Sequence, residues 1–431
     1  MPLPASIEVV PPDKPFGSQI ALPGSKSITN RALILAALAE ASVTLEGALW
    51  SEDTQVMVGA LARLGIALQV QPDPTEAGNR RITVLGSGGR LAPGGPPERP
   101  VELFVGNAGT AARFLTALTC LGQGCYRLDG VPRMRERPQA ELFTALRNLG
   151  YRIDSPGDRL PAVVHGAGPR PGSCTVSIGE SSQFASALLL SAPRAGWTVH
   201  VRDSHPEEAP YVAMTRELAQ RFPHSGGSMA IEPDASSGSY FWAAAHLLRR
   251  PLGPGATITV IGWPTSGWQV DQRFPEYLPL PPRVSRQQDL GDSILTAAML
   301  APFASGPITF TDLGRLRLQE CERVQALRTE LTRCGARVIE AHDTLTVYPG
   351  PMHGAEIETY EDHRLAMCFA TLGLHVPGVR IKNPSCVAKT FPNFFRKLAA
   401  PPPVGLGVIL LDSRTRLPLP QPDLDPRPPT A

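Results

Sequence analysis

Several signals that would assign the chain to a common class are missing from its 431 residues. Its seven cysteines are an odd number without a CxxC pair, which argues against a disulfide framework and against a zinc site. No apolar run reaches the roughly 18 residues that a membrane helix needs. The first residues also lack the charged and apolar segments of a signal peptide. We therefore expect a cytoplasmic protein.

The chain also lacks an excess of either positive or negative charge. The formal net charge is +2 and the pI is about 8.2, whereas nucleic-acid modules usually exceed a pI of about 9. The balance excludes binding of a polyanion by the whole surface. Hydrophobic residues make up 42% of the chain, enough for a sizeable core. At about 150 residues per domain, the length suits two or three domains.

Motifs for cofactors and metals are absent too. No GxGxxG follows a strand, and neither HExxH nor GxSxG occurs. The segment GSKS resembles a phosphate-binding P-loop, but Ser25 and Ile20 stand where that motif requires glycine. The sequence therefore disfavours a nucleotide kinase, and we expect neither a metal nor an organic cofactor.

A repeated α/β pattern is the most informative feature present. Six times, an apolar helix rich in alanine and leucine leads within roughly 15–30 residues to a short alternating strand. We expect the helices to begin near Arg31, Arg113, Phe184, Tyr240, Ile294 and Arg364. The strands that follow are VTLEGAL, YRLDGVP, VHVRDS, ITVIGWP, ITFTDLG and VRIKNPS. Six copies of one α/β unit, three in each of two domains, are the simplest arrangement.

The domain bounds follow from where the repeats fall. Residues 1–22 with 232–397 are expected to form one domain, and residues 23–231 the other. Within repeats, a second helix ends at a glycine suited to the left-handed position after a helix, as in ALARLGIALQV, ALRNLGYRI and ELTRCGARVIE. Residues 156–172 read as a loop. The prolines of residues 398–431 predict a tail that supplies no packed element.

Small, polar and charged residues precede the six helices, in PGSKSITNR, GNAGTAAR, GESSQF, EPDASSGS, DLGDS and YEDHR. Helix N-termini attract anions, but the same residue types are ordinary N-caps, and either explanation is open for a single helix. Only five of the 41 basic residues are lysines, and two of them, Lys26 and Lys389, lie in or near motifs of this kind. The guanidinium group of arginine binds phosphate and carboxylate groups through two parallel hydrogen bonds. Together these residues predict a site for one or two small, strongly anionic substrates.

Three residues are candidates for acid–base work: Asp292, Glu320 and His363. Each also has a structural alternative. Asp292 could be an N-cap, Glu320 an exposed helix residue three positions from Arg323, and His363 a neighbour of a cap. Nearby cations favour the charged form of a carboxylate, whereas protonating a substrate requires desolvation or a negative neighbour.

The segments LPGSKSITNRAL, LFVGNAGTAARFLTAL, VPRMRERP, SSQFASALLLSAP, PDASSGSYF and YEDHRLAMCF…AKTFPNFF, in this order, resemble the enolpyruvyl transferase family. Within it, they resemble the enzymes whose acceptor is shikimate 3-phosphate. The resemblance implies an α/β fold: a two-domain inside-out α/β barrel of six βαβαββ repeats, three per domain. It also implies transfer of the enolpyruvyl group of phosphoenolpyruvate to the 5-hydroxyl of shikimate 3-phosphate, with release of phosphate through a tetrahedral intermediate. The implied protein is a cofactor-free monomer of chorismate and aromatic amino acid biosynthesis.

The resemblance also implies roles for individual residues. Residues for phosphoenolpyruvate are Lys26, Gly109, Arg137, Gln183, Arg323, Arg364 and Lys389. Residues for shikimate 3-phosphate are Lys26, Ser27, Arg31, Ser181, Ser182, Gln183, Tyr211, Asp292, Arg315 and Gln319. Asp292 resembles the base at the attacking hydroxyl, and Glu320 the group that exchanges a proton with the methylene carbon. Lys26 also belongs to the catalytic set, and His363 is expected to support the leaving phosphate.

Three positions depart from the family pattern, all on the sugar-phosphate side. Gln319 replaces a lysine, Arg315 replaces an asparagine and Glu208 replaces a serine. Our hypothesis is that Arg315 supplies the charge that Gln319 lacks. Transfer to a UDP-sugar would need a reactive cysteine between Arg133 and Pro138, where there is none. Another acceptor, or a non-catalytic anion-binding relative, is the remaining alternative.

Overall fold

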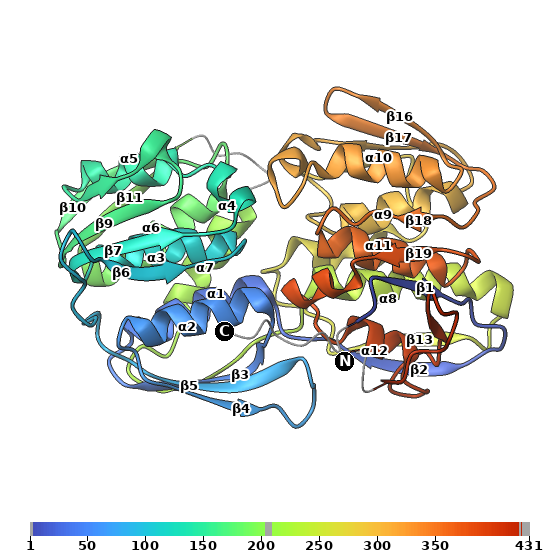
Figure 1. Cartoon of the computed structure of the whole chain (residues 1–431), viewed down its shortest axis with the longest axis horizontal. Coiled ribbons are helices and arrows are strands. Elements are labelled where there is room, and N and C mark those ends of the chain that lie inside the picture. Colours follow the sequence, from blue (N-terminus) through green and yellow to red (C-terminus); the bar gives the residue numbers. More distant parts are fainter. Residues whose placement is uncertain (1–2, 203–208, 422–423, 425–431) are drawn as a thin grey trace. The chain divides into compact units, whose positions relative to one another are not determined.

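The chain divides into two compact units in the computed structural model (Figure 1), in which residues 3–202, 209–421 and 424 are described. One unit is Gly24–Glu232, and the other combines Met1–Pro23 with Pro233–Ala431. Both crossings of the chain lie within one residue of the expected bounds of the domain 23–231. We call them the Gly24 unit and the Pro233 unit.

Three inner helices form the core of the Gly24 unit: α1 (Lys26–Leu38), α3 (Gly109–Thr119) and α6 (Ser182–Ala195). They contact one another and are buried on nearly all sides. A helix that is apolar all round needs such surroundings, which explains the Ala- and Leu-rich composition of these segments. No helix built from the described residues is long and apolar enough to cross a membrane.

Sheets and outer helices surround these inner helices. The first sheet has the order β12 (Gly227–Ala230), β3 (Ser42–Leu49), β5 (Asn79–Leu85), β4 (Leu68–Pro72). The second has the order β6 (Val101–Phe104), β7 (Gln123–Asp129), β9 (Ala162–Ala167), β8 (Arg152–Asp154), and the third pairs β10 (Gly172–Ser177) with β11 (Trp197–Arg202). The other helices are α2 (Glu52–Arg63), α4 (Pro132–Glu136), α5 (Ala140–Asn148), α7 (Ala209–Arg221) and the 3-10 turn η1 (Pro156–Asp158).

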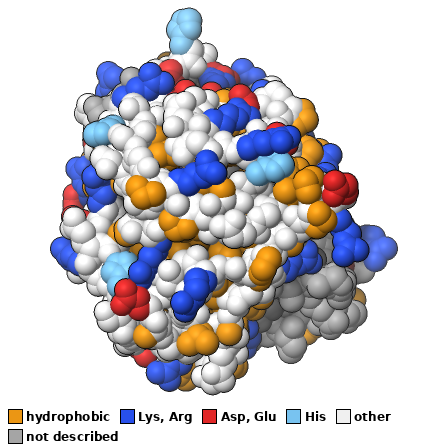
Figure 2. All heavy atoms as spheres, turned by 90° about the vertical axis from the view of Figure 1, so that its left-hand side faces the viewer, with side chains coloured by type: hydrophobic (Ala, Val, Ile, Leu, Met, Phe, Trp, Pro, Cys, Tyr) orange, Lys and Arg blue, Asp and Glu red, His pale blue; other side chains and the backbone are white. Residues whose placement is uncertain are grey.

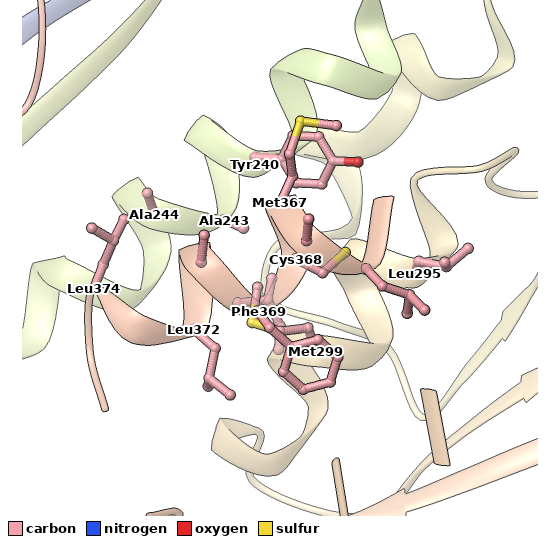
Figure 3. Packing of buried hydrophobic residues seen from close by; sticks show 14 of the residues in the cluster. Tyr240, Ala243, Ala244, Leu295, Met299, Met367, Cys368, Phe369, Leu372 and Leu374 are labelled. Atoms are coloured by element: carbon pink, nitrogen blue, oxygen red, sulfur yellow. The ribbon is translucent and has the colours of Figure 1, made fainter. Parts of the chain in front are cut away.

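The Pro233 unit repeats this plan. Its inner helices are α8 (Ala235–Leu252), α9 (Ile294–Leu300) and α11 (His363–Gly373). Figure 3 shows their apolar side chains packed together, with Tyr240 from α8, Met299 from α9 and Phe369 from α11 in one buried cluster. Such close packing fixes where each helix begins, and therefore where the polar residues at its start lie.

The sheets of the Pro233 unit also follow the same pattern. One has the order β14 (Arg283–Ser285), β15 (Ile308–Thr311), β17 (Thr344–Tyr348), β16 (Arg337–Ala341). Another has the order β18 (Glu356–Ile357), β19 (Arg380–Lys382), β1 (Ser6–Val9), β20 (Leu410–Asp412), and β13 (Thr257–Ile261) pairs with β2 (Gly17–Ala21). The other helices are α10 (Arg323–Arg333), α12 (Phe394–Ala399), η2 (Val270–Tyr277), η3 (Ala301–Phe303), η4 (Gly314–Leu318) and η5 (Pro384–Lys389).

The four four-stranded sheets formed by the described residues share one pairing pattern: a parallel first pair is followed by two antiparallel pairs. This repetition confirms the predicted α/β repeat. The six predicted helices are the six inner helices, which begin up to five residues earlier than expected because their polar first turns are helical. Gly65, Gly150 and Gly335 have φ of 83°, 86° and 95°, which confirms the predicted left-handed position after α2, α5 and α10.

Two expectations were wrong. Residues 156–172 are more than a loop, because β9 lies inside this segment as a central strand. The tail supplies a packed element, because β20 pairs with β1 and Leu406, Val408 and Leu410 are buried. Prolines stand before and after β20 and leave its three residues free to pair at the sheet edge, where proline does least harm.

Figure 2 shows dispersed charged side chains on one face of the molecule. On the face that Figure 2 shows, the basic side chains among the described residues lie scattered between neutral and apolar ones and form no continuous block. The dispersed charges on this face agree with the near-neutral net charge of the chain.

Candidate active site

Asp292 is the centre of a buried charge cluster in the Pro233 unit. It stands two residues before α9, and its side chain is 18% exposed. Its Oδ2 lies 2.9 Å from Arg364 Nη2 and 3.8 Å from Arg323 Nη1, and its Oδ1 accepts a hydrogen bond of 3.3 Å from Arg286 Nη2. The residue is not the N-cap of α9, because Ser293 holds that position. The structural alternative considered for Asp292 is therefore wrong.

The surroundings of Asp292 decide its charge. Burial alone would raise the pKa of the carboxyl group, but the positive charges of Arg364, Arg323 and Arg286 outweigh it and hold the pKa well below its usual range. Asp292 is consequently ionised at every physiological pH. In the absence of substrate it is a strongly paired anion and a weak base.

Arg323 links the acidic residues of this cluster. It is 1% exposed and begins α10. Its guanidinium group lies 2.6 Å from Asp362 Oδ2 and 2.8 Å from Glu320 Oε2, and it donates to Gln319 Oε1. Burial favours the neutral form, but these carboxylates and Asp292 hold the pKa of Arg323 above its usual value. Its charge is therefore permanent.

Glu320 and His363 are both packed inside the cluster. Glu320 precedes α10, and its side chain is 10% exposed, so the alternative of an exposed helix residue is wrong. His363 is the first residue of α11, and its Nδ1 lies 3.7 Å from Asp362 Oδ1. Asp362 caps α11 by accepting from Arg364 N at 2.8 Å. The N-terminus of α11 therefore lies in the same cluster as Asp292.

Two further predicted residues belong to 3-10 turns of the same unit. Lys389 ends η5, which packs against α11, and it is buried. Arg315 lies in η4, and Gln319 directly follows that turn. The Pro233 unit thus brings Asp292, Glu320, Arg323, His363 and Arg364 into one hydrogen-bonded and ion-paired cluster.

The Gly24 unit contains a second group of buried cations. Lys26 begins α1, and its Nζ lies 3.2 Å from the buried carboxylate of Asp53. Arg137 is buried and donates to Asn107 O at 3.1 Å, at the turn that leads into α3. A Cβ atom at Gly109, the first residue of α3, would stand 2.7 Å from Arg137 Nη2. The glycine therefore lets this guanidinium lie directly against the helix start.

Arg31 is held by hydrogen bonds within the Gly24 unit. It is 2% exposed, and its guanidinium donates to Thr215 Oγ1 at 2.7 Å, Ser186 Oγ at 3.0 Å and Ser27 O at 3.0 Å. It also lies 5.3 Å from the ring centre of Phe114. The guanidinium group of Arg31 is therefore buried inside the unit, where the low dielectric strengthens the effect of its positive charge on neighbouring groups.

The predicted residues at α6 and α7 are placed as follows. Ser181 is the N-cap of α6, and its Oγ accepts from Gln183 N at 3.2 Å, so here the ordinary capping explanation holds. Ser182 and Gln183 belong to the first turn of the helix, and Ser182 is buried. Tyr211 lies in α7. Glu208 lies outside the described residues.

The sequence matches the family model of EPSP synthase (3-phosphoshikimate 1-carboxyvinyltransferase) over residues 10–223 and 255–398. The chain belongs to the EPSP synthase family. Curated relatives named 3-phosphoshikimate 1-carboxyvinyltransferase include one from Nostoc punctiforme, 37% identical over 91% of this chain and 98% of the relative. Another, from Opitutus terrae, is 39% identical over 93% of this chain and 98% of the relative.

Solved structures agree on the fold. EPSP synthase from Acinetobacter baumannii superposes with a TM-score of 0.69 at 20% identity, covering 94% of this chain and 99% of that one. The enolpyruvyl transferase NikO from Streptomyces tendae gives a TM-score of 0.68 at 17% identity, covering 97% and 100%. The predicted family, the enolpyruvyl transferase fold and the predicted transfer from phosphoenolpyruvate to shikimate 3-phosphate are therefore confirmed.

Several charged residues around the EPSP synthase motifs were not identified from the sequence. Asp53, Asp271 and Arg286 carry no motif signal, because each meets its partners only through tertiary packing within its own unit. Asp362 could have been found, since it stands in the quoted segment YEDHR directly before a predicted helix. Asp362 caps α11 and forms an ion pair with Arg323, so it connects the start of α11 to the charge cluster.

Proposed function

We propose that Asp292 and Glu320 perform the proton transfers of this enolpyruvyl transfer. In this proposal Asp292 accepts the proton of the attacking hydroxyl, and Glu320 exchanges a proton with the methylene carbon of phosphoenolpyruvate. The observation that carries the proposal is the position of the Asp292 carboxylate, which three arginines hold beside an Arg323–Glu320 pair. Asp292 and Glu320 both lie near Arg323, which places the proposed base and the proposed acid at one guanidinium group.

The arginines explain how a weak base becomes effective. Arg364 and Arg323 are the expected ligands of the phosphoenolpyruvate anion, and without substrate their charges are neutralised by Asp292 and Glu320. An incoming phosphate or carboxylate competes for the same guanidinium groups. Competition weakens the pairing of Asp292 and raises its pKa toward the usual range. The base is therefore activated when the substrate is in place.

The cations of the Gly24 unit are proposed to hold the phosphates and carboxylates of the substrates. Two phosphate groups of about −1.5 to −2 each and two carboxylates bring roughly −5 to −6 charges. Six cations are proposed to meet them: Lys26, Arg31, Arg137, Arg323, Arg364 and Lys389. Gln183 is proposed to act as a neutral hydrogen-bonding partner, with Ser27, Ser181, Ser182 and Tyr211 on the shikimate 3-phosphate side. His363 is proposed to support the leaving phosphate.

The acceptor side is proposed to depend on Arg315. Gln319 accepts a hydrogen bond from Arg323, whereas a lysine at this position has no acceptor and would place a second cation beside that guanidinium. The glutamine is thus tied to the phosphoenolpyruvate-binding arginine, and one positive charge is lost from the position of the family lysine. Arg315, four residues earlier at the same turn, is the residue proposed to restore it.

A phosphate-release assay tests the function and its rivals together. Release is expected only when phosphoenolpyruvate and shikimate 3-phosphate are both present. Asp292→Asn and Glu320→Gln are each expected to lower kcat by at least about 100-fold, the usual range for loss of a general acid or base. The matched control is Glu340→Gln, a carboxylate paired with Arg317 outside the cluster, which should leave kcat unchanged. Binding of phosphoenolpyruvate without turnover would instead indicate another acceptor or a non-catalytic relative.

We also propose that the chain is a monomer in the cytoplasm. Each unit encloses its own core of inner helices, which needs no second chain. The seven cysteines are free and five of them are buried, as is usual in a reducing compartment. Light scattering after size-exclusion chromatography should give a mass near 46.1 kDa, and twice that mass would refute the monomer.

A further inference from the structure

Asp271 is a buried carboxylate with more hydrogen bonds than any single cap requires. It lies in η2 and is 4% exposed. Its Oδ1 accepts from Gly291 N at 2.8 Å, from Ser293 N at 3.1 Å and from Ser293 Oγ at 2.6 Å. One oxygen atom therefore binds the backbone on both sides of Asp292.

The segment that Asp271 binds has no cap of its own. Ser293, the N-cap of α9, makes no side-chain capping bond to its own helix, because its hydroxyl donates to Asp271 instead. The N–H groups of Gly291 and Ser293 would otherwise need a partner in the protein interior. The carboxylate from η2 thus determines the path of the backbone at Asp292.

The same turn fixes the start of the neighbouring inner helix. Asp271 Oδ2 accepts a hydrogen bond from Ser236 Oγ in the first turn of α8. Two residues earlier, Gln269 Oε1 accepts from Ala235 N at 2.9 Å, and its amide nitrogen donates to Pro233 O at 2.7 Å. The turn therefore ties the start of α8 to the residues around Asp292.

We propose that Asp271 is a positioning residue of the enolpyruvyl transfer, which acts by holding the backbone on both sides of Asp292 so that its carboxylate stays aligned for proton transfer. The inference rests on the role proposed above for Asp292. Asp271 itself touches no substrate in this account. Its effect should appear in kcat, because small errors in the placement of a reacting group cost far more in rate than in binding.

Two substitutions at Asp271 measure this effect. Asp271→Ala removes all four hydrogen bonds and is expected to lower kcat by about 10- to 100-fold, with KM for both substrates within about threefold. Asp271→Asn keeps an oxygen that can accept from Gly291 N and Ser293 N, so it should recover a large part of the lost kcat. If the alanine variant does not fold, the asparagine variant carries the test. It should then fall about three- to tenfold in kcat, and an unchanged kcat overturns the proposal.

Asp289 provides the matched control. It lies between β14 and α9, three residues before Asp292, and it accepts from Ser285 N at 2.8 Å and from Tyr277 Oη at 2.6 Å rather than from the residues that flank Asp292. Asp289→Ala removes a comparable anchor and should lower the thermal unfolding midpoint without a comparable loss of kcat. Equal losses of kcat in Asp271→Ala and Asp289→Ala would mean that Asp271 is merely structural.

A double variant separates positioning from general damage. If Asp271 acts only through Asp292, then Asp271→Ala combined with Asp292→Asn should have the kcat of Asp292→Asn alone, because residues that act as a unit are not additive. Multiplicative losses overturn the proposal. The single variant Asp292→Asn reports on the underlying function by itself: full activity there refutes the role of Asp292, whereas a large loss there with wild-type kcat in Asp271→Ala refutes only the inference about Asp271.

Discussion

Asp292 Oδ2 lies 2.9 Å from Arg364 Nη2, and this ion pair joins the start of α9 to the start of α11. The same carboxylate faces Arg323 at 3.8 Å and Arg286 at 3.3 Å. One negative charge thus compensates part of three buried positive charges. Removing one partner of a buried pair leaves uncompensated charge, which is costly even where the intact pair contributes little.

Replacing Asp292 should therefore weaken the fold in a way that an anion can reverse. Asp292→Asn is expected to lower the free energy of unfolding at pH 7 by about 3 kcal/mol, because the three arginines lose their shared counter-charge. Phosphoenolpyruvate should then raise the thermal unfolding midpoint more in the variant than in the wild type, since its anionic groups replace the missing carboxylate. A thermal-shift titration measures both. Equal shifts in the two proteins would refute the proposal that substrate and Asp292 compete for the same arginines.

The stability that Asp292 contributes should persist to unusually low pH. Its pKa in the folded chain lies below the ordinary value of 3.8, so its contribution is present above that ordinary value and is lost as the pH falls through the lower folded pKa. The difference in free energy of unfolding between wild type and Asp292→Asn should stay constant from pH 8 to about pH 5. It should shrink only below about pH 4. A difference that fades between pH 7 and pH 5 would contradict the pairing with arginines.

Gly109 should be intolerant of any side chain at the binding step but not in folding. The methyl group of Gly109→Ala would stand 2.7 Å from the guanidinium nitrogens of Arg113 and Arg137, whose flexible ends can shift to make room. We expect KM for phosphoenolpyruvate to rise about tenfold as Arg137 moves, with an unchanged unfolding midpoint. Gly59 in α2 is the control, since a methyl group there meets nothing within 4 Å. An unchanged KM would exclude Gly109 and Arg137 from the site.

Arg315 and Gln319 should affect only the acceptor. If Arg315 carries the charge that is missing at Gln319, Arg315→Ala should raise KM for shikimate 3-phosphate by about tenfold and leave KM for phosphoenolpyruvate unchanged, as expected for loss of one charge-assisted hydrogen bond. Adding Gln319→Lys to Arg315→Ala should recover part of that affinity. Steady-state kinetics with each substrate varied in turn gives both constants. A rise in KM for phosphoenolpyruvate instead would assign Arg315 to the other substrate.

The repeats were predictable from the sequence because they depend on local patterns. The inner helices are apolar on all sides, and each strand that follows alternates, so composition alone located all six pairs. Glycines such as Gly65 adopt a left-handed backbone conformation that other residues disfavour. Their positions in the sequence therefore also predicted where the outer helices end. The strand β9 was not predicted, because its six residues lie among glycines and prolines that are typical of a loop.

The charge cluster was only partly predictable, because its members meet through packing. Sequence motifs placed Asp292 and Arg364 at helix starts, but nothing in a linear pattern shows that Arg286 reaches Asp292 or that Asp271 binds the residues beside it. Arg31 shows that a motif does not reveal the internal hydrogen bonds of a residue. Its motif predicts a phosphate ligand, and the structure surrounds its guanidinium with internal acceptors.

The tail should prove essential to the Pro233 unit although the family match ends at residue 398. Its strand β20 pairs with β1, Gln19 N donates to Pro403 O at 2.7 Å, and Leu406 and Leu410 are buried. A chain that ends at residue 402 would expose the edge of β1 and should aggregate or unfold at a lower temperature. Leu410→Ala alone should cost about 2–5 kcal/mol of unfolding free energy. A chain that ends at residue 424 retains these contacts and serves as the control. If the shorter chain keeps the unfolding midpoint of the control, β20 is dispensable, and the inner helices, with the sheets before residue 398, suffice to hold the cluster around Asp292.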